Sequence, residues 1–196
     1  MLYACIRGIG RFIFYILGLK VENLDNLPSK GAVIIAANHV SNWDPILLAL
    51  ALDRPIHFMG KADLFKNRIL GKIFTRLNAF PVRKDIPDRQ AIKKALQILA
   101  EGQALGIFPE GGRNFSGDLK VQAGVVLLAL KSGAPIVPVG LLGTDRRLPQ
   151  GWFRPLLVRV GEPFQLAQVT NPTSKADATE QQSAAIMSRI NNLLYK

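Results

Sequence analysis

The chain has 196 residues, of which 48% are hydrophobic and 20% are charged, so it can form one domain with a sizeable core and carries no disorder signature. The 25 Lys and Arg residues against 14 Asp and Glu give a formal net charge of +11, which is typical of a protein with an anionic partner: nucleic acid, an anionic membrane or a phosphorylated substrate. The single cysteine, Cys5, excludes an intramolecular disulfide framework and disfavours a cysteine-based zinc site.

The excess charge is concentrated in one internal block. Residues 1–53 carry four basic and four acidic residues, and residues 95–196 carry ten and seven. Residues 54–94 carry eleven basic and three acidic residues, a local net charge of +8. A local excess of this size favours a shared anionic partner over a scatter of solvated surface residues.

The N-terminal segment is apolar but short. It contains two charges, Arg7 and Arg11, and no uninterrupted stretch of the roughly 18–20 apolar residues that span a bilayer; a secretory signal also fits poorly. On a helix the arginines fall on one side, which predicts a helix lying in the membrane interface with its arginines at the headgroups. The alternative is a helix packed on the protein's own core. We therefore predict a membrane-interface anchor over residues 1–19 and a single domain over residues 20–196.

From residue 31 onward, short apolar runs alternate with longer amphipathic stretches. In chain order, the patterns predict a strand over 32–37, a helix over 45–52, a strand over 56–59, a helix over 64–77, a strand over 79–82, a helix over 88–100, a strand over 104–108, a helix over 121–131, strands over 136–141 and 156–160, and a helix over 179–194. The polar segment 171–178 is predicted to be a loop. This alternation predicts an α/β fold with a mixed, largely parallel central sheet flanked by helices.

A polar segment from Asn38 to Asp44 follows the first of these strands, at the place where α/β folds carry function. His39 and Asp44 are five residues apart across a Ser-Asn turn, so the carboxylate can reach one imidazole nitrogen and leave the other to accept a proton. A protein nucleophile is missing, because Cys5 lies far away, so the pair is predicted to activate a hydroxyl of a substrate. The other histidine, His57, lies within a predicted strand without an acidic residue at similar spacing, and we expect it to be structural.

Three cationic side chains follow three other predicted strands. Segment 108–114 combines Pro109 with paired glycines in a tight turn whose backbone amides can point at an oxyanion, and Arg113 can bind a phosphate in bidentate fashion. Arg83 follows the strand over 79–82, and Lys61 directly precedes a helix. Taken alone, such a turn is more often an ordinary glycine turn with a surface arginine. Three cations at three strand-to-loop junctions suit a phosphate monoester better than a long nucleic acid.

Together these segments resemble the glycerolipid acyltransferase family, specifically the 1-acyl-sn-glycerol-3-phosphate acyltransferases. Residues 38–44 match the NHxxxxD block of that family, and residues 60–64 through 80–83 match its second block. Residues 108–113 match the third block, usually FPEGTR, and residues 134–139 match the proline-containing fourth. The resemblance covers roughly residues 20–165, and four blocks in order make it specific.

The resemblance implies transfer of a fatty acyl group from acyl-CoA or acyl-carrier protein to the sn-2 hydroxyl of lysophosphatidic acid, giving phosphatidic acid in phospholipid biosynthesis. His39 is then the general base and Asp44 its orienting partner, with Asn38 and Pro138 in support. The implied acceptor and phosphate site consists of Lys61, Arg83, Glu110, Gly111 and Arg113. Candidates for stabilising the thioester oxyanion are the amides of Gly111 and the side chain of Lys61. No metal or other cofactor is implied, and the expected location is the cytoplasmic face of a membrane, with peripheral or monotopic attachment.

The sequence departs from the family pattern at three positions. Gly112 stands where the family usually has Thr, and Asn114 stands where Ser is common. Without the Thr hydroxyl we expect a local hydrogen bond to be lost. We also expect the more flexible turn to alter the preference for the acceptor. Asp63 replaces a frequent Glu in the second block, which is a conservative change.

Two other functions remain open on the sequence. The acceptor could be glycerol-3-phosphate or another lysolipid, or the chain could be a non-catalytic module that binds anionic lipid or nucleic acid. The basic block lacks the interleaved aromatic residues and motifs of nucleic-acid binders, so we expect no nucleic-acid partner. A non-catalytic binder would not need both His39 and Asp44. The remaining basic residues of the block are expected to face an anionic membrane surface; they include Lys66, Arg68, Lys72 and Arg76.

Overall fold

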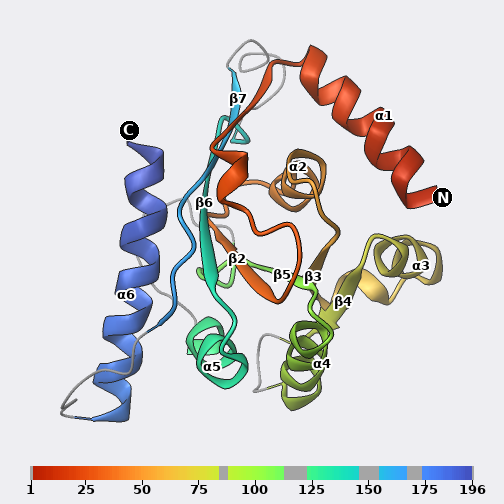
Figure 1. Cartoon of the computed structure of the whole chain (residues 1–196). Helices are drawn as coiled ribbons and strands as arrows, with labels where there is room; N and C mark the ends of the chain where they lie inside the picture. The colour runs from red at the N-terminus through yellow and green to blue at the C-terminus, as the bar shows by residue number, and fades with distance from the viewer. Residues whose placement is uncertain (1, 84–87, 113–122, 146–154, 167–173, 196) are drawn as a thin grey trace.

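A seven-stranded sheet runs through the centre of the computed structural model, which describes residues 2–83, 88–112, 123–145, 155–166 and 174–195 (Figure 1). The strands, in spatial order, are β1 (Leu19–Glu22), β7 (Leu156–Val160), β6 (Ile136–Leu142), β2 (Val33–Ala37), β5 (Ala104–Ile107), β3 (Ile56–Lys61) and β4 (Ala79–Val82). The five strands from β6 to β4 are mutually parallel, whereas β7 runs antiparallel to β6 and carries β1 parallel to itself. The prediction of an α/β fold with a mixed, largely parallel sheet is confirmed.

Helices cover both faces of the sheet (Figure 1). One face carries α2 (Asp44–Ala51), with α1 (Leu2–Ile16) packed outside it, and the other carries α4 (Arg89–Ala100), α5 (Ala123–Ser132) and α6 (Lys175–Leu194). Two short 3₁₀ helices, η1 (Leu24–Asn26) and η2 (Ala62–Phe65), follow β1 and β3, and α3 (Arg68–Arg76) leads into β4. Side-chain caps fix several starts: Asp88 accepts two backbone N–H groups of α4, and Ser174 accepts one of α6.

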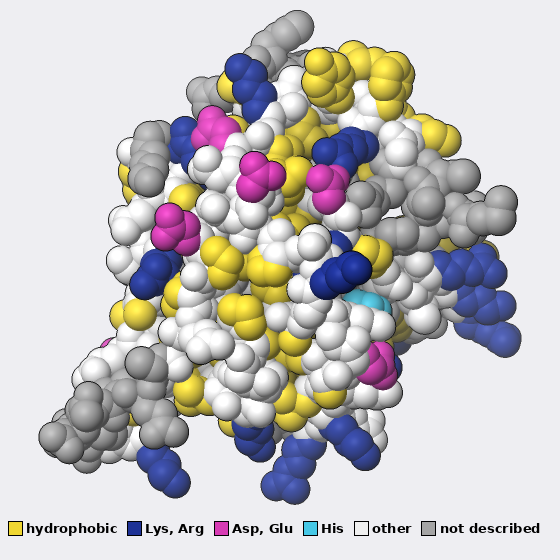
Figure 2. Space-filling view, viewed as in Figure 1, with side chains coloured by type: hydrophobic (Ala, Val, Ile, Leu, Met, Phe, Trp, Pro, Cys, Tyr) yellow, Lys and Arg dark blue, Asp and Glu magenta, His cyan; other side chains and the backbone are white. Residues whose placement is uncertain are grey.

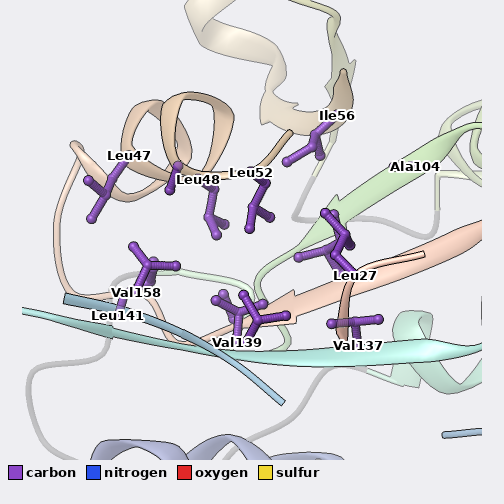
Figure 3. Close-up of a cluster of buried hydrophobic side chains, with 14 of the residues drawn as sticks. Leu27, Leu47, Leu48, Leu52, Ile56, Ala104, Val137, Val139, Leu141 and Val158 are labelled. Carbon is purple, nitrogen blue, oxygen red and sulfur yellow. The ribbon is translucent and has the colours of Figure 1, made fainter. Parts of the chain in front are cut away.

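Alternation along the central strands divides the core between the two faces of the sheet. In β2, Val33, Ile35 and Ala37 join the cluster under α2, whereas Ile34 and Ala36 join the cluster under α4, α5 and α6. All five residues are fully buried, as expected for a strand covered on both faces. Figure 3 shows the first cluster, in which leucine side chains of α2 point onto the sheet. The carboxyl end of β2, at Ala37, is therefore packed on both faces of the sheet.

Helix α1 packs against the protein along one face and exposes apolar residues on the other. A Cβ added to Gly10 would press on Leu50 of α2, and Phe14 packs on the first core cluster. The opposite face presents large apolar side chains to solvent, with Phe12 65% and Tyr15 74% exposed. No helix in the described ranges is both long and apolar enough to cross a bilayer. The membrane-interface anchor over residues 1–19 stays a prediction, and its boundary with the domain over residues 20–196 falls inside β1.

Two local expectations were wrong, and one strand was missed. β1 was not predicted, because its four residues include Lys20 and Glu22 and carry little strand pattern. The helix predicted over 64–77 is broken, because the side chain of Asn67 accepts the N–H groups of Ile69 and Leu70 and so caps a new helix after η2. The loop predicted over 171–178 ends earlier than expected: α6 begins at Lys175, and residues 171–173 lie outside the described residues.

Arg54 is one of the few buried charged residues among those described, although it belongs to the basic block. Its guanidinium donates to the carbonyl oxygens of Pro28 at 2.6 Å and Gly31 at 2.7 Å, and more weakly to that of Gly102 at 3.3 Å. Burial lowers the pKa of this guanidinium from its usual value. Arg54 therefore ties the loop before β2 to the turn after α4 and is not available to an anionic partner.

We expect Arg54→Met to lower the free energy of unfolding by about 2–4 kcal/mol, because three carbonyl oxygens lose a charged donor. Urea denaturation monitored by circular dichroism measures this loss. Arg89→Met, which removes an equal charge from the exposed first turn of α4, should change stability by less than about 0.5 kcal/mol. Equal effects of the two substitutions would show that the contacts of Arg54 contribute nothing specific.

Candidate functional site

The carboxyl ends of the parallel strands bring most of the predicted site residues to one edge of the sheet. His39 follows β2, Glu110 follows β5, Lys61 ends β3 and Arg83 follows β4. These four strands are consecutive neighbours in the sheet. Adjacent strands lie about 4.8 Å apart, so the ends of β3 and β4 lie about 10 Å and 14 Å from the end of β2. Flexible Lys and Arg side chains can bridge most of such gaps.

Asn38 joins the ends of β2 and β6. Its side-chain amide donates to the carbonyl oxygen of Leu141 at 2.9 Å, and its carbonyl oxygen accepts the backbone N–H of Leu141 at 2.7 Å. The side chain thus continues the pairing of the two strands by one step, and Asn38 is buried. This two-way contact fixes the backbone from which His39 projects, which fits the supporting role expected of Asn38.

His39 and Asp44 form the predicted contact. Nδ1 of His39 lies 2.8 Å from Oδ2 of Asp44, the first residue of α2. The same oxygen accepts the backbone N–H groups of Val40 and Ser41, each at 2.8 Å. Asp44 is fully buried, and its other oxygen, Oδ1, has no hydrogen-bond partner among the described residues. The carboxylate is therefore committed to one side, where it holds the loop and the imidazole together.

This contact fixes the chemistry of the imidazole. A carboxylate oxygen only accepts, so Nδ1 carries the proton that it donates, and Nε2 of a neutral ring is left with a lone pair. The side chain of His39 is 17% exposed, so it is accessible at the surface of the site. The arrangement can remove a proton from a bound hydroxyl and stabilise the resulting imidazolium through Asp44.

Two phenylalanines hold the flat face of the imidazole. The ring of His39 stacks on Phe108 with a centroid distance of 4.2 Å, and Phe108 stacks on Phe58 at 6.2 Å. Phe58 lies over Gly106, where an added Cβ would overlap its ring. Gly106 in β5 therefore makes room for Phe58, and Phe58 supports Phe108. The imidazole is fixed by its edge through Asp44 and by its face through Phe108.

Glu110 ties the loop after β5 to the loop after β2. Its Oε1 accepts the backbone N–H of His39 at 3.1 Å. Gly111 has a φ of +68°, a conformation that glycine adopts without strain, and its N–H donates to the carbonyl oxygen of Phe108 at 3.0 Å. That N–H closes the tight turn, so the structure gives it a partner within the protein. The roles of Glu110 and Gly111 toward a phosphate or an oxyanion stay predictions.

The cations at the ends of β3 and β4 have carboxylate partners. Nζ of Lys61 and Nζ of Lys66 lie 2.7 Å from the two oxygens of Asp63, and hydrogen bonds from these lysines, Lys61 first, lower the pKa of that carboxyl to about 2. Nε of Arg83 lies 3.5 Å from Oδ2 of Asp88, which also accepts the backbone N–H of Arg83. Both Lys61 and Arg83 are more than half exposed, so a ligand can compete for them.

Other predicted residues do not meet at this edge. Pro138 is buried within β6 beside Ala36, on the face of the sheet opposite to the α2 cluster. Arg113 and Asn114 lie outside the described residues. His57 lies in β3, and burial and the charge of Lys94 lower its pKa; its structural role stays a prediction. No group of His, Cys, Asp and Glu in the described part of the chain is arranged to hold a metal ion.

Sequence reasoning missed the aromatic support of the imidazole. The motif after β5 includes Phe108 but indicates no role for it, and no motif includes Phe58 or Gly106. Part of the signal was present, because residues two apart along a strand share a face, which places Gly106 and Phe108 together. Their pairing with Phe58 depends on the order β5–β3 in the sheet, which no local pattern reveals.

We expect Asp44→Ala to change the tautomer of the neutral His39 ring. The substitution removes the one oxygen that contacts Nδ1 and accepts the N–H groups of Val40 and Ser41, so nothing holds the proton on Nδ1 and the ring shifts toward the form protonated at Nε2. Nitrogen NMR shifts of the ring, recorded at a pH where it is neutral, distinguish the two tautomers. The His57 ring is the internal control and should not change; an unaltered His39 tautomer would contradict the role given to the carboxylate.

Comparison with known proteins agrees with this geometry. The family model described as "Acyltransferase" matches residues 18–142. A 1-acyl-sn-glycerol-3-phosphate acyltransferase of Bacillus subtilis is 35% identical over 160 residues, which cover 81% of this chain and 79% of that protein. One of Borreliella burgdorferi is 33% identical over 150 residues, 74% of this chain and 58% of that protein.

A solved structure has the same fold over almost the whole chain. The crystal structure of the 1-acyl-sn-glycerophosphate (LPA) acyltransferase PlsC from Thermotoga maritima superposes with a TM-score of 0.67 at 25% identity, covering 99% of this chain and 81% of that one. The family model covers well over half of the residues, including those of the imidazole–carboxylate pair. The resemblance inferred from the four sequence blocks is thereby confirmed, and the chain belongs to the acyltransferase family.

Proposed function

We propose that this protein transfers a fatty acyl group from an acyl thioester, acyl-CoA or acyl-carrier protein, to the sn-2 hydroxyl of lysophosphatidic acid, giving phosphatidic acid for phospholipid biosynthesis. The observation that carries this proposal is the 2.8 Å contact between His39 Nδ1 and the buried carboxylate of Asp44. It prepares Nε2 to accept a proton at the edge of the sheet. The names of the relatives from Bacillus subtilis and Thermotoga maritima supply the substrate class.

The reaction follows from the state of the imidazole. Nε2 of His39 takes the proton of the acceptor hydroxyl while its oxygen attacks the thioester carbonyl carbon, forming the ester C–O bond. The tetrahedral intermediate then expels the sulfur as the C–S bond breaks, and the imidazolium returns the proton to the thiolate. Asp44 stabilises the imidazolium between these steps, and Phe108 limits rotation of the ring.

The acceptor is oriented by its phosphate. Lys61, one strand beyond the Glu110 loop, is the nearest described cation of the proposed phosphate site to the end of β2. Only a short glycerol backbone separates the reacting hydroxyl from the phosphate, so Lys61 makes the main contact and Arg83, one strand further, assists from the side. Arg113 belongs to the proposed site through its place in the sequence block, and Gly111 through the turn after β5.

The protein acts at a membrane surface and is attached peripherally to the cytoplasmic face of that membrane. The supporting observation is the outward face of α1, which exposes Ile9, Phe12, Tyr15 and Ile16. Figure 2 shows hydrophobic side chains gathered over α1 at the upper right. Arg11, which was expected to contact headgroups, instead pairs its guanidinium with Asp53 next to α2. An exposed apolar helix face favours a lipid acceptor over a water-soluble one.

We expect the purified protein to consume acyl thioester when lysophosphatidic acid is supplied in detergent micelles, with phosphatidic acid detected by mass spectrometry. His39→Ala should lower kcat about 10²- to 10⁴-fold, the usual contribution of a general base. His57→Gln removes the other histidine and should retain turnover, because that ring lies within β3 and not at the carboxyl ends of the strands.

Two results would overturn the assignment. Equal rates for wild type and His39→Ala would remove the general base. Turnover with glycerol-3-phosphate or lysophosphatidylcholine but not with lysophosphatidic acid would replace the acceptor while leaving the acyltransferase chemistry in place.

Lys61→Ala should raise the KM for lysophosphatidic acid by about 10- to 100-fold and leave the KM for the acyl thioester unchanged, because one charged contact to phosphate contributes about 1.5–3 kcal/mol. Lys66→Ala is the matched control, since Lys66 contacts the same carboxylate of Asp63 at the same distance but follows η2. Identical acceptor kinetics for the two variants would exclude Lys61 from the phosphate site.

A further inference from the structure

Helix α3 is held to the rest of the protein by a narrow face. None of its nine residues is buried, which distinguishes it from α2, α4, α5 and α6. The ring of Phe74 lies 5.8 Å from that of Phe65 in η2, and Gly71 approaches the backbone of Phe65 so closely that an added Cβ would lie 2.9 Å from its carbonyl oxygen. Phe74 and Gly71 thus mark the inner side of α3.

The outer side of α3 carries apolar side chains in water. Ile69 is 72% exposed and Ile73 is 45% exposed, and because they are four residues apart they form one ridge. Leu70 flanks this ridge and is also exposed. Helical geometry places the ridge away from Phe74 and Gly71. A helix this short gains little stability by itself, so its exposed isoleucines call for a further contact.

Basic residues line one edge of that ridge. Arg68, Lys72 and Arg76 occupy successive turns of α3, and the helix contains no acidic residue. The nearest carboxylate in the sequence, Asp63, is already shared by Lys61 and Lys66. Figure 2 shows Lys and Arg side chains gathered at the right of the molecule, where Figure 1 places α3. Within the described residues, no ion pair neutralises the three cations of α3.

This combination fits an anionic bilayer. Apolar side chains enter the boundary between headgroups and acyl chains, and adjacent Lys and Arg side chains contact anionic headgroups. A second copy of the same surface would bring like charges together, and a nucleic acid would leave Ile69 and Ile73 unburied. The occupant that satisfies both the charge and the apolar ridge is a lipid surface.

We propose that the outer face of α3, defined by Ile69, Ile73, Lys72 and Arg76, is a lipid-binding surface that docks this protein on anionic membranes in addition to α1. This inference rests on the proposed function in one respect, because that function places the lipid acceptor in an anionic membrane. Because η2 joins β3 to α3, docking of α3 brings the end of β3, where Lys61 lies, close to the headgroups. The acceptor phosphate then needs to move only a short way from the bilayer to the site.

Co-sedimentation with vesicles of phosphatidylglycerol and phosphatidylcholine in equal parts tests the apolar ridge and the charges separately. Lys72→Gln with Arg76→Gln should weaken binding by about 10- to 30-fold, since each cation contributes about fivefold near an anionic surface, and should not change binding to pure phosphatidylcholine. Ile69→Ser with Ile73→Ser should weaken binding to both kinds of vesicle by about tenfold or more.

Matched controls lie on other helices. Arg89→Gln with Lys93→Gln removes one Arg and one Lys, also four residues apart and exposed, from α4. Leu127→Ser with Leu130→Ser removes two exposed leucines from α5. Both control variants should bind vesicles as the wild type does.

The activity of the same variants separates this inference from the proposed function. With acceptor in detergent micelles, the α3 variants should keep the wild-type kcat, because none of the substituted residues belongs to the site. Wild-type binding to anionic vesicles by both α3 variants would overturn the docking surface even if acyl transfer is normal. Conversely, loss of vesicle binding in a protein without any acyltransferase activity would support α3 and reject the proposed function. A dimer that dissociates on Ile69→Ser with Ile73→Ser, seen by gel filtration without vesicles, would also overturn the docking surface.

Discussion

The parallel pairing of β2 with both β5 and β6 is the constraint on which the candidate site depends. A chain can add a parallel neighbour only by crossing back to the starting edge of the sheet, usually through a helix. Each crossover therefore delivers the next strand end to the same edge, and segments separated by about a hundred residues meet there. Asn38 extends this order past the strands, because it bonds Leu141 as a further strand residue would. The backbone that carries the His39 imidazole is therefore fixed by neighbouring strands on both sides of β2.

Immobilising a histidine requires control of its edge and of its face, and the two come from different parts of the fold. The edge is controlled locally: Asp44 begins α2, and one of its oxygens binds His39, Val40 and Ser41 together. The face is controlled by two neighbouring strands, from Gly106 in β5 through Phe58 in β3 to Phe108 after β5. The buried carboxylate, with Oδ1 unpaired among the described residues, is costly to maintain. It is best compensated when the neighbouring imidazole carries charge, which is the state that follows proton abstraction.

These two origins explain what the sequence could predict. The apolar runs located six of the seven strands, and the five-residue spacing located the contact between His39 and Asp44, because both signals are local. The broken helix over 64–77 was misjudged because apolar periodicity continued across Asn67 while a side-chain cap interrupted the backbone. The stacking of Phe108 and the carbonyl contacts of Arg54 were not foreseen. Both join residues from elements whose order in space is decided by the whole sheet.

The basic block of residues 54–94 looks uniform in the sequence, but its cations have different environments in the structure. Arg54 is buried against carbonyl oxygens and serves the fold. Around η2, the carboxylate of Asp63 lies 2.7 Å from Nζ of both Lys61 and Lys66, and so it offsets part of their charge. Helix α3 carries three cations and no acidic residue, whereas the charge of Lys61 at the proposed phosphate site is offset by Asp63. If α3 is the docking surface and Lys61 the phosphate contact, as proposed, an anionic bilayer is attracted to α3 first, and Lys61 exchanges Asp63 for a phosphate only once a lipid headgroup is close.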